Sequence, residues 1–256
     1  MTAEFLTADP LAGLPHGFFT RRGGVSSGGF ASLNCSLSGK DDAGDVATNR
    51  ARAMAALGLP PEALCGLTQV HGIEVAVLTG PLPDGSRPTA DAMVTKVPGL
   101  ALGIVTADCG PVLFADREAG VVGAAHAGWR GAVAGMLEAT LDAMEGLGAT
   151  RKKITAVVGP CIRQDSYEVG ADLRDAVLAR AAADARFLIA GRRDDHWQFD
   201  LAGYCAARLV AAGAGTVAVI PADTFAEPQR FFSHRRRMLN GEGPIGHQLS
   251  AIALPG

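Results

Sequence analysis

Two reactive side chains lie beside apolar stretches in the segment TADCGPVLFADREAGVVGAAHAGWRG, which runs from Thr106 to Gly131. They are the thiol of Cys109 and the imidazole of His126. Such a pair can bind zinc, because thiolate sulfur and imidazole nitrogen are preferred zinc ligands. It can also act as a nucleophile and its base, since a nearby histidine lowers the pKa of a thiol. A third interpretation is plain packing, because free cysteine is among the most buried residue types.

The spacing of Cys109 and His126 predicts that the two side chains meet. PVLFAD and VVGAAH read as short strands joined by the loop REAG. In such a hairpin Asp116 pairs with Val121, which places His126 opposite Pro111. Cys109 lies two residues before Pro111 and shares its face of the strand. We therefore expect Cys109 and His126 to be diagonal neighbours.

A second histidine, His71 in GLTQVHGIEVAV, also stands at the edge of an apolar segment. A catalytic zinc ion commonly has three protein ligands and one open position. We predict that His71, Cys109 and His126 are these ligands. Two other interpretations stay open: a hydrolase with Cys109 as nucleophile and His126 as base, and a zinc-stabilised binding module.

Further residues are candidates for catalysis. Asp108, which precedes the cysteine, is predicted to orient a ligand or to act as a general base, with a turn cap as the alternative. Arg21 stands in the glycine-rich loop TRRGG, which suits a phosphate or carboxylate. We also expect phosphate beside the helix that begins near Trp129, at the backbone of Gly128–Gly131.

Three polar side chains are candidates for substrate binding: Gln69, Asn34 and Arg130. Gln69 lies two residues before His71 and can bond a base or a ribose. Asn34 lies in a loop, and Arg130 follows Trp129. A surface amide or a solvated arginine is the alternative at each position. Cys161 and Tyr167 are weaker candidates for the lining of the site.

The composition limits the class of protein. Of 256 residues, 48% are hydrophobic and 19% are charged, which is typical of a globular protein. A formal net charge of −3 without a basic block argues against a nucleic-acid partner. No apolar run is long enough for a membrane span, and MTAEFLTADPLAG does not read as a signal peptide, so we expect neither. The five scattered cysteines indicate reduced thiols, so we expect a cytoplasmic protein, and we expect a monomer.

Strands and helices alternate along the chain, which predicts an α/β domain over residues 1–256 with a mixed sheet. The predicted strands are Ile73–Leu78, Leu100–Ala107, Pro111–Asp116, Val121–His126, Ile154–Gly159 and Thr216–Ala222. The predicted helices are Asp45–Gly58, Trp129–Gly148, Ala171–Asp184 and Asp200–Gly213, with Asp45 and Asp200 as N-caps. Gly80–Asp91 reads as a surface loop.

Eight ordered blocks of the chain resemble one family: FFTRRGGVSSGGFASLN, TQVHG, ADAMVT, TADCGPVLFAD, GAAHAGWRG, GPCI with SYEVG, FDL and RFFSHRR. This is the YfiH-like family, also called the laccase-domain, polyphenol-oxidase or peptidoglycan editing factor family. The resemblance extends from about Phe18 to Leu254. It implies a single-domain α/β/α fold and a zinc ion held by His71, Cys109 and His126.

The resemblance also implies activities. Family members are described as purine nucleoside phosphorylases acting on adenosine, inosine and methylthioadenosine, with adenosine deaminase activity. Older descriptions give copper-dependent phenol oxidation, and a cell-wall editing role is also attached. Two positions depart from the family pattern: His247 stands where the family has arginine, and Cys35 where an aliphatic residue is common. We expect zinc, with copper as the alternative, and a purine nucleoside plus phosphate as substrates.

Overall fold

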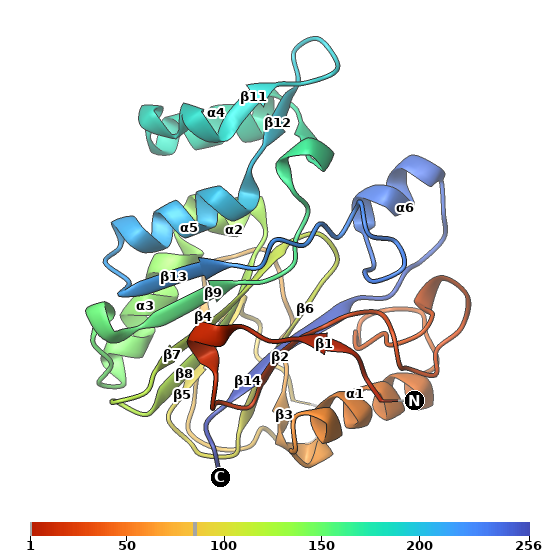
Figure 1. Cartoon of the computed structure of the whole chain (residues 1–256), viewed down its shortest axis with the longest axis vertical. Helices are drawn as coiled ribbons and strands as arrows, with labels where there is room; N and C mark the ends of the chain where they lie inside the picture. Colours follow the sequence, from red (N-terminus) through yellow and green to blue (C-terminus); the bar gives the residue numbers. More distant parts are fainter. Residues whose placement is uncertain (1, 84–85) are drawn as a thin grey trace.

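The computed structural model describes residues 2–83 and 86–256, and its centre is formed by two β-sheets (Figure 1). The six-stranded sheet has the order β13-β9-β7-β8-β5-β4 and the five-stranded sheet the order β1-β2-β14-β6-β3. The strands of the six-stranded sheet are β4 (Val75–Leu78), β5 (Ala92–Thr95), β7 (Gly110–Asp116), β8 (Val121–Ala127), β9 (Thr155–Val158) and β13 (Thr216–Val219). Those of the five-stranded sheet are β1 (Phe5–Leu6), β2 (His16–Phe19), β3 (Leu64–Cys65), β6 (Ala101–Thr106) and β14 (Gln248–Ala253).

The chain has six described α-helices. They are α1 (Ala43–Ala56), α2 (Trp129–Ala134), α3 (Met136–Gly146), α4 (Ala171–Arg180), α5 (Leu201–Ala211) and α6 (His234–Asn240). Helix α1 covers the outer face of the five-stranded sheet, and α3 and α5 cover that of the six-stranded sheet (Figure 1). A three-stranded sheet near α4 contains β10 (Glu168–Val169), β11 (Leu188–Ala190) and β12 (Trp197–Phe199). Short 3-10 helices span Asp9–Leu11, Gly28–Phe30, Pro61–Ala63, Arg151–Lys153, Gln164–Ser166 and Ala182–Phe187.

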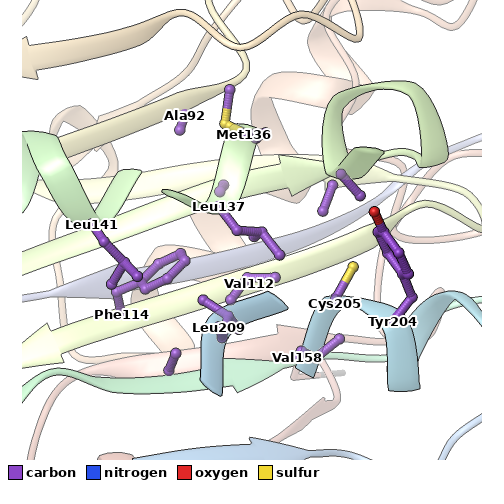
Figure 2. Packing of buried hydrophobic residues seen from close by; sticks show 14 of the residues in the cluster. Ala92, Val112, Phe114, Met136, Leu137, Leu141, Val158, Tyr204, Cys205 and Leu209 are labelled. Carbon is purple, nitrogen blue, oxygen red and sulfur yellow. The ribbon is translucent and has the colours of Figure 1, made fainter. Parts of the chain in front are cut away.

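Alternation along β7 shows how the layers pack. Val112 and Phe114 face the core formed with α3 and α5, where Leu137 and Leu209 pack (Figure 2). Leu113 points the opposite way, into the core between the two sheets. Helix α1 packs against the outer face of the five-stranded sheet, and the buried residues between them form a third core. The predicted α/β/α layering with mixed sheets is confirmed, and its β layer consists of two packed sheets.

The hairpin register is also confirmed. Asp116 pairs with Val121, and Pro111 pairs with His126, in the antiparallel ladder of β7 and β8. The six-stranded sheet is mixed. Its outer strands are parallel to their neighbours, β4 to β5 and β13 to β9, while β5 and β8, and β7 and β9, are antiparallel.

Two details of the predicted helices are wrong. The N-cap of α1 is Asp42 rather than Asp45: its side chain accepts hydrogen bonds from the N–H groups of Gly44 and Asp45 at 2.8 and 3.0 Å. The helix predicted over Trp129–Gly148 is two helices, because Gly135 adopts a φ of 111° and ends α2. The predicted cap of α5 is confirmed, since Asp200 accepts from the N–H of Gly203 at 2.9 Å.

Five strands of the two large sheets were not predicted: β1, β2, β3, β5 and β14. Of these, β14 lies between β2 and β6. The described part of the Gly80–Asp91 loop holds no helix and only an isolated bridge between Thr89 and Thr68. Asp84 and Gly85 lie outside the described residues. Among the described helices, none is long and apolar enough to cross a membrane.

Candidate active site

The candidate metal ligands lie where the chain passes from one sheet to the other. His71 is in the connection from β3 to β4, and Cys109 is in the connection from β6 to β7. Both connections leave the five-stranded sheet and enter the six-stranded sheet. Since β3 and β6 are parallel neighbours, their carboxyl ends lie at the same edge. The topology therefore brings His71 and Cys109 together although they are far apart in the sequence.

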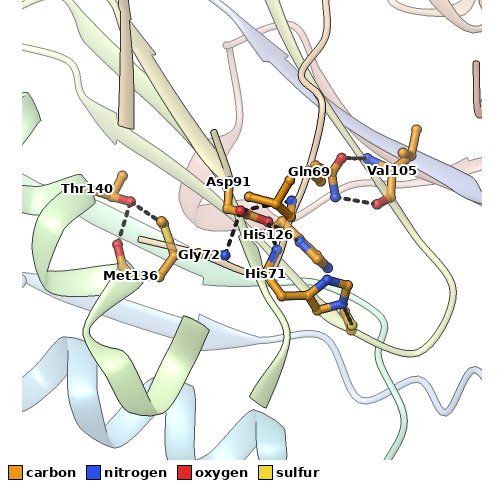
Figure 3. Close-up of polar contacts among 10 residues, drawn as sticks. Gln69, His71, Gly72, Asp91, Val105, His126, Met136 and Thr140 are labelled. Atoms are coloured by element: carbon orange, nitrogen blue, oxygen red, sulfur yellow. Dashed lines mark hydrogen bonds and ion pairs between the residues drawn. The ribbon is translucent and has the colours of Figure 1, made fainter. Parts of the chain in front are cut away.

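Gln69 ties these two connections to each other. Its side-chain Nε2 donates to the carbonyl oxygen of Val105 at 2.9 Å, and its Oε1 accepts from the N–H of Val105 at 3.0 Å (Figure 3). The amide thus pairs with the β6 backbone much as a neighbouring strand would. Gln69 lines the cavity described below, but both ends of its amide are already hydrogen-bonded.

His71, Cys109 and His126 form a compact cluster. One ligand atom from each residue lies within 4.8 Å of the other two. The Cys109 Sγ is 3.8 Å from Nε2 of His71, and the two imidazole rings meet edge to face with centroids 4.7 Å apart. The diagonal contact predicted from the hairpin register is present. In the described residues, no second group of three such side chains comes as close.

Gly128 leaves room for this cluster. A Cβ atom there would lie 2.7 Å from Cδ2 of His71 and 3.2 Å from Sγ of Cys109. A larger residue would push the histidine ring and the thiol apart. The cluster thus lies directly against the backbone at Gly128, where we also predicted a phosphate.

Asp91 organises the cluster, and the sequence analysis did not single it out. Its Oδ1 accepts from Nδ1 of His126 at 2.7 Å and from the N–H of His71 at 2.9 Å. Its Oδ2 accepts from the N–H groups of Val70 and Gly72 at 3.1 and 2.7 Å. These bonds hold His71 in a left-handed conformation with φ 62° (Figure 3). The position of Asp91 directly before a buried strand was the available signal.

The electrostatics match this geometry. Burial raises the pKa of the Cys109 thiol, but His126 and His71 outweigh burial and lower that pKa to about 6. Burial lowers the pKa of His126, while Cys109 and Asp91 raise it, with a net increase. Burial likewise raises the pKa of Asp91, yet the bonds from His126, Gly72 and Val70 lower it overall. The cysteine is therefore readily available as a thiolate, the form that binds metals.

These residues fit a metal ion. Two imidazoles and one thiolate are suitable zinc ligands, and a carboxylate bonded to the second nitrogen of a ligand histidine is a usual outer partner. Because Asp91 binds Nδ1 of His126, the Nε2 of that ring is left for the metal. His71, Cys109 and His126 would hold the ion, and the remaining position would face the cavity.

That cavity has a volume of about 470 Å³, within the usual range for small-molecule sites. The three cluster residues line it together with Gln69, Trp129, Arg130, Tyr167 and others. Arg130 stacks over the ring of Trp129 with its guanidinium carbon 4.4 Å from the centroid. Arg130, which we predicted to bind substrate, thus lines the same cavity as the cluster.

Asp108 lines the same cavity, but its carboxylate is engaged elsewhere. It accepts hydrogen bonds from the hydroxyls of Thr224 and Ser233, at 2.6 and 2.9 Å, and from the N–H of Arg235 at 2.6 Å. Burial raises the pKa of Asp108 in spite of these bonds. The residue thus fixes the first turn of α6 beside the cluster.

Three other predicted residues are not brought to the cluster. Arg21 lines a separate pocket, where its guanidinium donates to the carbonyls of Ala31 and Pro228. Asn34 is buried, and its side chain bonds to backbone and to Asp41. Cys161 is buried, and burial raises its pKa to about 12. In each case nearby loop or core groups already surround the side chain.

Two histidines that showed no ligand spacing, His234 and His247, do line the cavity. Burial, with His234 and His126 nearby, lowers the pKa of His247 to about 4, so its ring is neutral. Its buried Nδ1 has no hydrogen-bond partner among the described residues. A neutral imidazole therefore lines the cavity at the position where the family pattern has arginine.

Comparisons with known proteins agree with this fold and site. A family model described as multi-copper polyphenol oxidoreductase laccase matches residues 15–255. A purine nucleoside phosphorylase of Deinococcus radiodurans is 42% identical over 246 residues, covering 96% of this chain and 91% of the relative. A protein of the same name from Mycobacterium bovis is 40% identical over 233 residues, covering 91% and 89%.

Solved structures are also similar. The hypothetical protein YfiH of Bacillus licheniformis superposes with a TM-score of 0.91 at 28% identity, covering 99% of this chain and 97% of the other. A Neisseria meningitidis protein superposes with a TM-score of 0.86 at 34% identity, covering 100% and 99%. The likeness in sequence and structure extends along nearly the whole chain, and the chain therefore belongs to the YfiH-like family, the laccase-domain family.

Proposed function

We propose that this protein is a zinc-dependent purine nucleoside phosphorylase that acts on adenosine, inosine and methylthioadenosine and also deaminates adenosine. The observation that carries the proposal is the cluster of His71, Cys109 and His126, which faces a cavity of nucleoside size. Three ligands with a fourth side open to a cavity are typical of a catalytic zinc site rather than of a closed structural one. Relatives named purine nucleoside phosphorylase support the choice of substrate.

Phosphorolysis joins an oxygen of phosphate to the anomeric carbon of the ribose. The bond from that carbon to the base nitrogen breaks, its electron pair leaves with the base, and the base nitrogen takes up a proton. The products are ribose 1-phosphate and free base. Deamination instead adds water at C6 of adenine and releases ammonia. Both reactions need a site that orients the purine and limits access of bulk water.

The side chains in and around the cavity can orient the purine and exclude water. Trp129 and Tyr167 offer aromatic surfaces for the purine, and Arg130 offers a cation beside them. Asp91 orients His126 and His71, while Asp108 and Gln69 are positioning residues that hold α6 and the two crossing connections. When bound, a zinc ion supplies Lewis-acid chemistry at this end of the cavity.

Zinc is favoured over copper by the ligand set. A His₂Cys copper site that transfers electrons usually has a long axial methionine, and oxidases with several coppers need further clustered histidines. The residues described around this cavity include no methionine, and the cluster contains two histidines. Phenol oxidation is therefore ranked below nucleoside chemistry.

A second candidate is a cysteine hydrolase, including one that acts on cell-wall precursors. The observation in its favour is the chain of contacts from Asp91 through His126 to Cys109, which resembles a nucleophile, base and orienting acid. Against it stands His71, whose Nε2 is 3.8 Å from the same sulfur. A nucleophile needs one base, whereas a metal needs several ligands.

The test is incubation of the zinc-loaded protein with inosine, with and without phosphate, followed by chromatography. We expect free hypoxanthine and ribose 1-phosphate only when phosphate is present. Adenosine and methylthioadenosine are assayed in the same way, and ammonia release from adenosine reports deamination. Absence of phosphate-dependent base release from all three nucleosides would overturn the proposal.

A further inference from the structure

The cavity that contains the metal cluster also has a basic wall that the cluster does not use. Arg50, from α1, and Arg87, from the loop before β5, both line it. Ser36 and Ser38 line it as well, and their hydroxyl oxygens lie 3.1 Å apart. This wall offers two guanidinium groups and two hydroxyls.

Strand β6 gives the separation between the Arg50 side of this wall and the cluster. Gly103 lines the cavity near the wall: a Cβ there would lie 3.2 Å from the carbonyl oxygen of Cys65, whose neighbour Gly66 approaches Arg50. Thr106 lines the cavity three strand positions further on, shortly before Cys109. At ~3.3 Å per strand residue, about 10 Å separates Gly103 from Thr106 alone. One purine nucleoside can lie between the two ends.

The positive charges at this wall are not neutralised by nearby acids in the described chain. Arg50 donates to the carbonyl of Cys35 at 3.2 Å, and neither Arg50 nor Arg87 forms an ion pair within residues 2–83 and 86–256. Burial lowers the pKa of Arg50, the nearby thiol of Cys35 raises it, and the charge of Arg87 lowers it. Two cations that lie close together in a partly buried wall favour an anion between them.

The serine side of this wall is held in place by the core. The buried Asn34 accepts from the N–H of Ser36 at 3.1 Å and from the N–H of His247 at 2.9 Å through the same oxygen. Its amide nitrogen donates to Asp41 at 2.8 Å. Asn34, which we predicted to bind substrate, instead positions Ser36 at the cavity.

We propose that Arg50, Arg87, Ser36 and Ser38 form the site for inorganic phosphate, the tetrahedral oxyanion that attacks the nucleoside. This inference rests on the proposed phosphorylase function. The two guanidinium groups bind phosphate oxygens and neutralise their charge, and the hydroxyls donate to the remaining oxygens.

The site also orients the nucleoside. Phosphate attacks the anomeric carbon from the side opposite the departing base. With phosphate at the arginines, the ribose lies in the middle of the cavity and the base points toward His71, Cys109 and His126. The same orientation brings C6 of adenine to the cluster, so one binding mode serves both proposed reactions.

The experiment measures binding of inorganic phosphate alone to the full-length protein by calorimetry, for the unaltered chain and for Arg50→Gln and Arg87→Gln. We expect each substitution to weaken phosphate binding about 10-fold to 100-fold, the usual effect of losing a charged hydrogen bond. Arg52→Gln is the matched control, since Arg52 is on the same helix but donates to the carbonyl of Gly23 outside the cavity. Arg87→Lys should restore part of the affinity.

Kinetics provide a second readout. Arg87→Gln should raise the KM for phosphate and leave the KM for inosine unchanged. If both glutamine variants fold, split inosine and keep their affinity for phosphate, the phosphate site is wrong and the phosphorylase function stands. If phosphate binding depends on the two arginines but no nucleoside is split, the function fails and the anion site stands. If the substitutions weaken only inosine 5′-monophosphate, the arginines bind a nucleotide phosphate and the proposal is overturned.

Discussion

Asp91 holds His126 at two points: its carboxylate accepts from Nδ1 of His126 at 2.7 Å, and its carbonyl oxygen accepts from the N–H of His126 at 2.7 Å. The ring and the backbone of this predicted ligand are therefore positioned by one residue. The same carboxylate accepts from the N–H of His71. Two of the three proposed ligands depend on a side chain that binds no metal itself.

Replacing Asp91 tests this dependence. Asp91→Asn should lower zinc affinity about 10-fold to 100-fold, because the outer partner sets ring orientation and ligand basicity. Competition with a chromophoric chelator measures the affinity. Asp172→Asn, an exposed change in the first turn of α4, should leave it unaltered. Full zinc affinity in Asp91→Asn would contradict the organising role.

The ligand assignment predicts a stoichiometry. Purified protein should contain about one zinc ion per chain, and Cys109→Ala should reduce this content sharply because one of three protein ligands is lost. Elemental analysis by mass spectrometry measures the metal, and Cys65→Ala, a change at a cysteine outside the cluster, is the control. A Cys109→Ala variant that keeps its full zinc content would show that the ligands are elsewhere.

Metal and thiol chemistry are separated by two reagents. If a metal is required for turnover, a strong chelator should abolish base release and added zinc should restore it. If Cys109 is a free nucleophile, the chelator should leave turnover intact, while an alkylating reagent should stop it. The measurement is turnover after metal removal has been confirmed. Turnover that persists without metal would favour the hydrolase.

Gly128→Ala should disturb the cluster without unfolding the protein. The added Cβ would lie 2.7 Å from the ring of His71 and 3.2 Å from the sulfur of Cys109, so one of them must move. Overpacking of this kind costs about 1–3 kcal/mol, and we expect weaker zinc binding with a cooperative unfolding transition retained. Gly146→Ala, where no neighbouring atom lies within 4 Å, is the control. Unchanged zinc affinity in Gly128→Ala would contradict the tight fit.

Asp108→Ala should destabilise α6 and leave the zinc content of the protein unchanged. Three donors would lose their acceptor, which is expected to lower the free energy of unfolding by about 3 kcal/mol. Hydrogen exchange should become faster in His234–Asn240, and Thr224→Val, which removes one bond, should give a smaller effect. If α6 stays protected while only turnover is lost, Asp108 is instead the general base of our first hypothesis.

Much of the cluster could be predicted because its geometry is local. The loop REAG sets the hairpin register, and the register sets the relation of Cys109 to His126. The N-caps of α1 and α5 also depend on near neighbours, and the cap at Asp200 was predicted correctly. At α1 both Asp42 and Asp45 can cap the helix, and Asp42, which comes first in the chain, does so.

The remaining features depend on pairings between distant segments. Nothing local in QLSAIA shows that β14 lies between β2 and β6, because that order depends on how the whole sheet assembles. The same reason explains why Arg21 was predicted at the site: a glycine-rich loop with arginine is a local pattern, but its position relative to His71 is not. Asp91 was missed because its four partners come from two other segments.

The two connections from the five-stranded to the six-stranded sheet, β3 to β4 and β6 to β7, have a consequence for the stability of the protein. A metal ion bound to His71 and Cys109 would link these two connections to each other. With His126 on β8 as the third ligand, it would cross-link the two sheets. An ion that binds only the folded chain stabilises it by about 2.7 kcal/mol at a free concentration 100 times its Kd. The free concentration of the metal would then set the stability of the folded chain as well as the occupancy of the site.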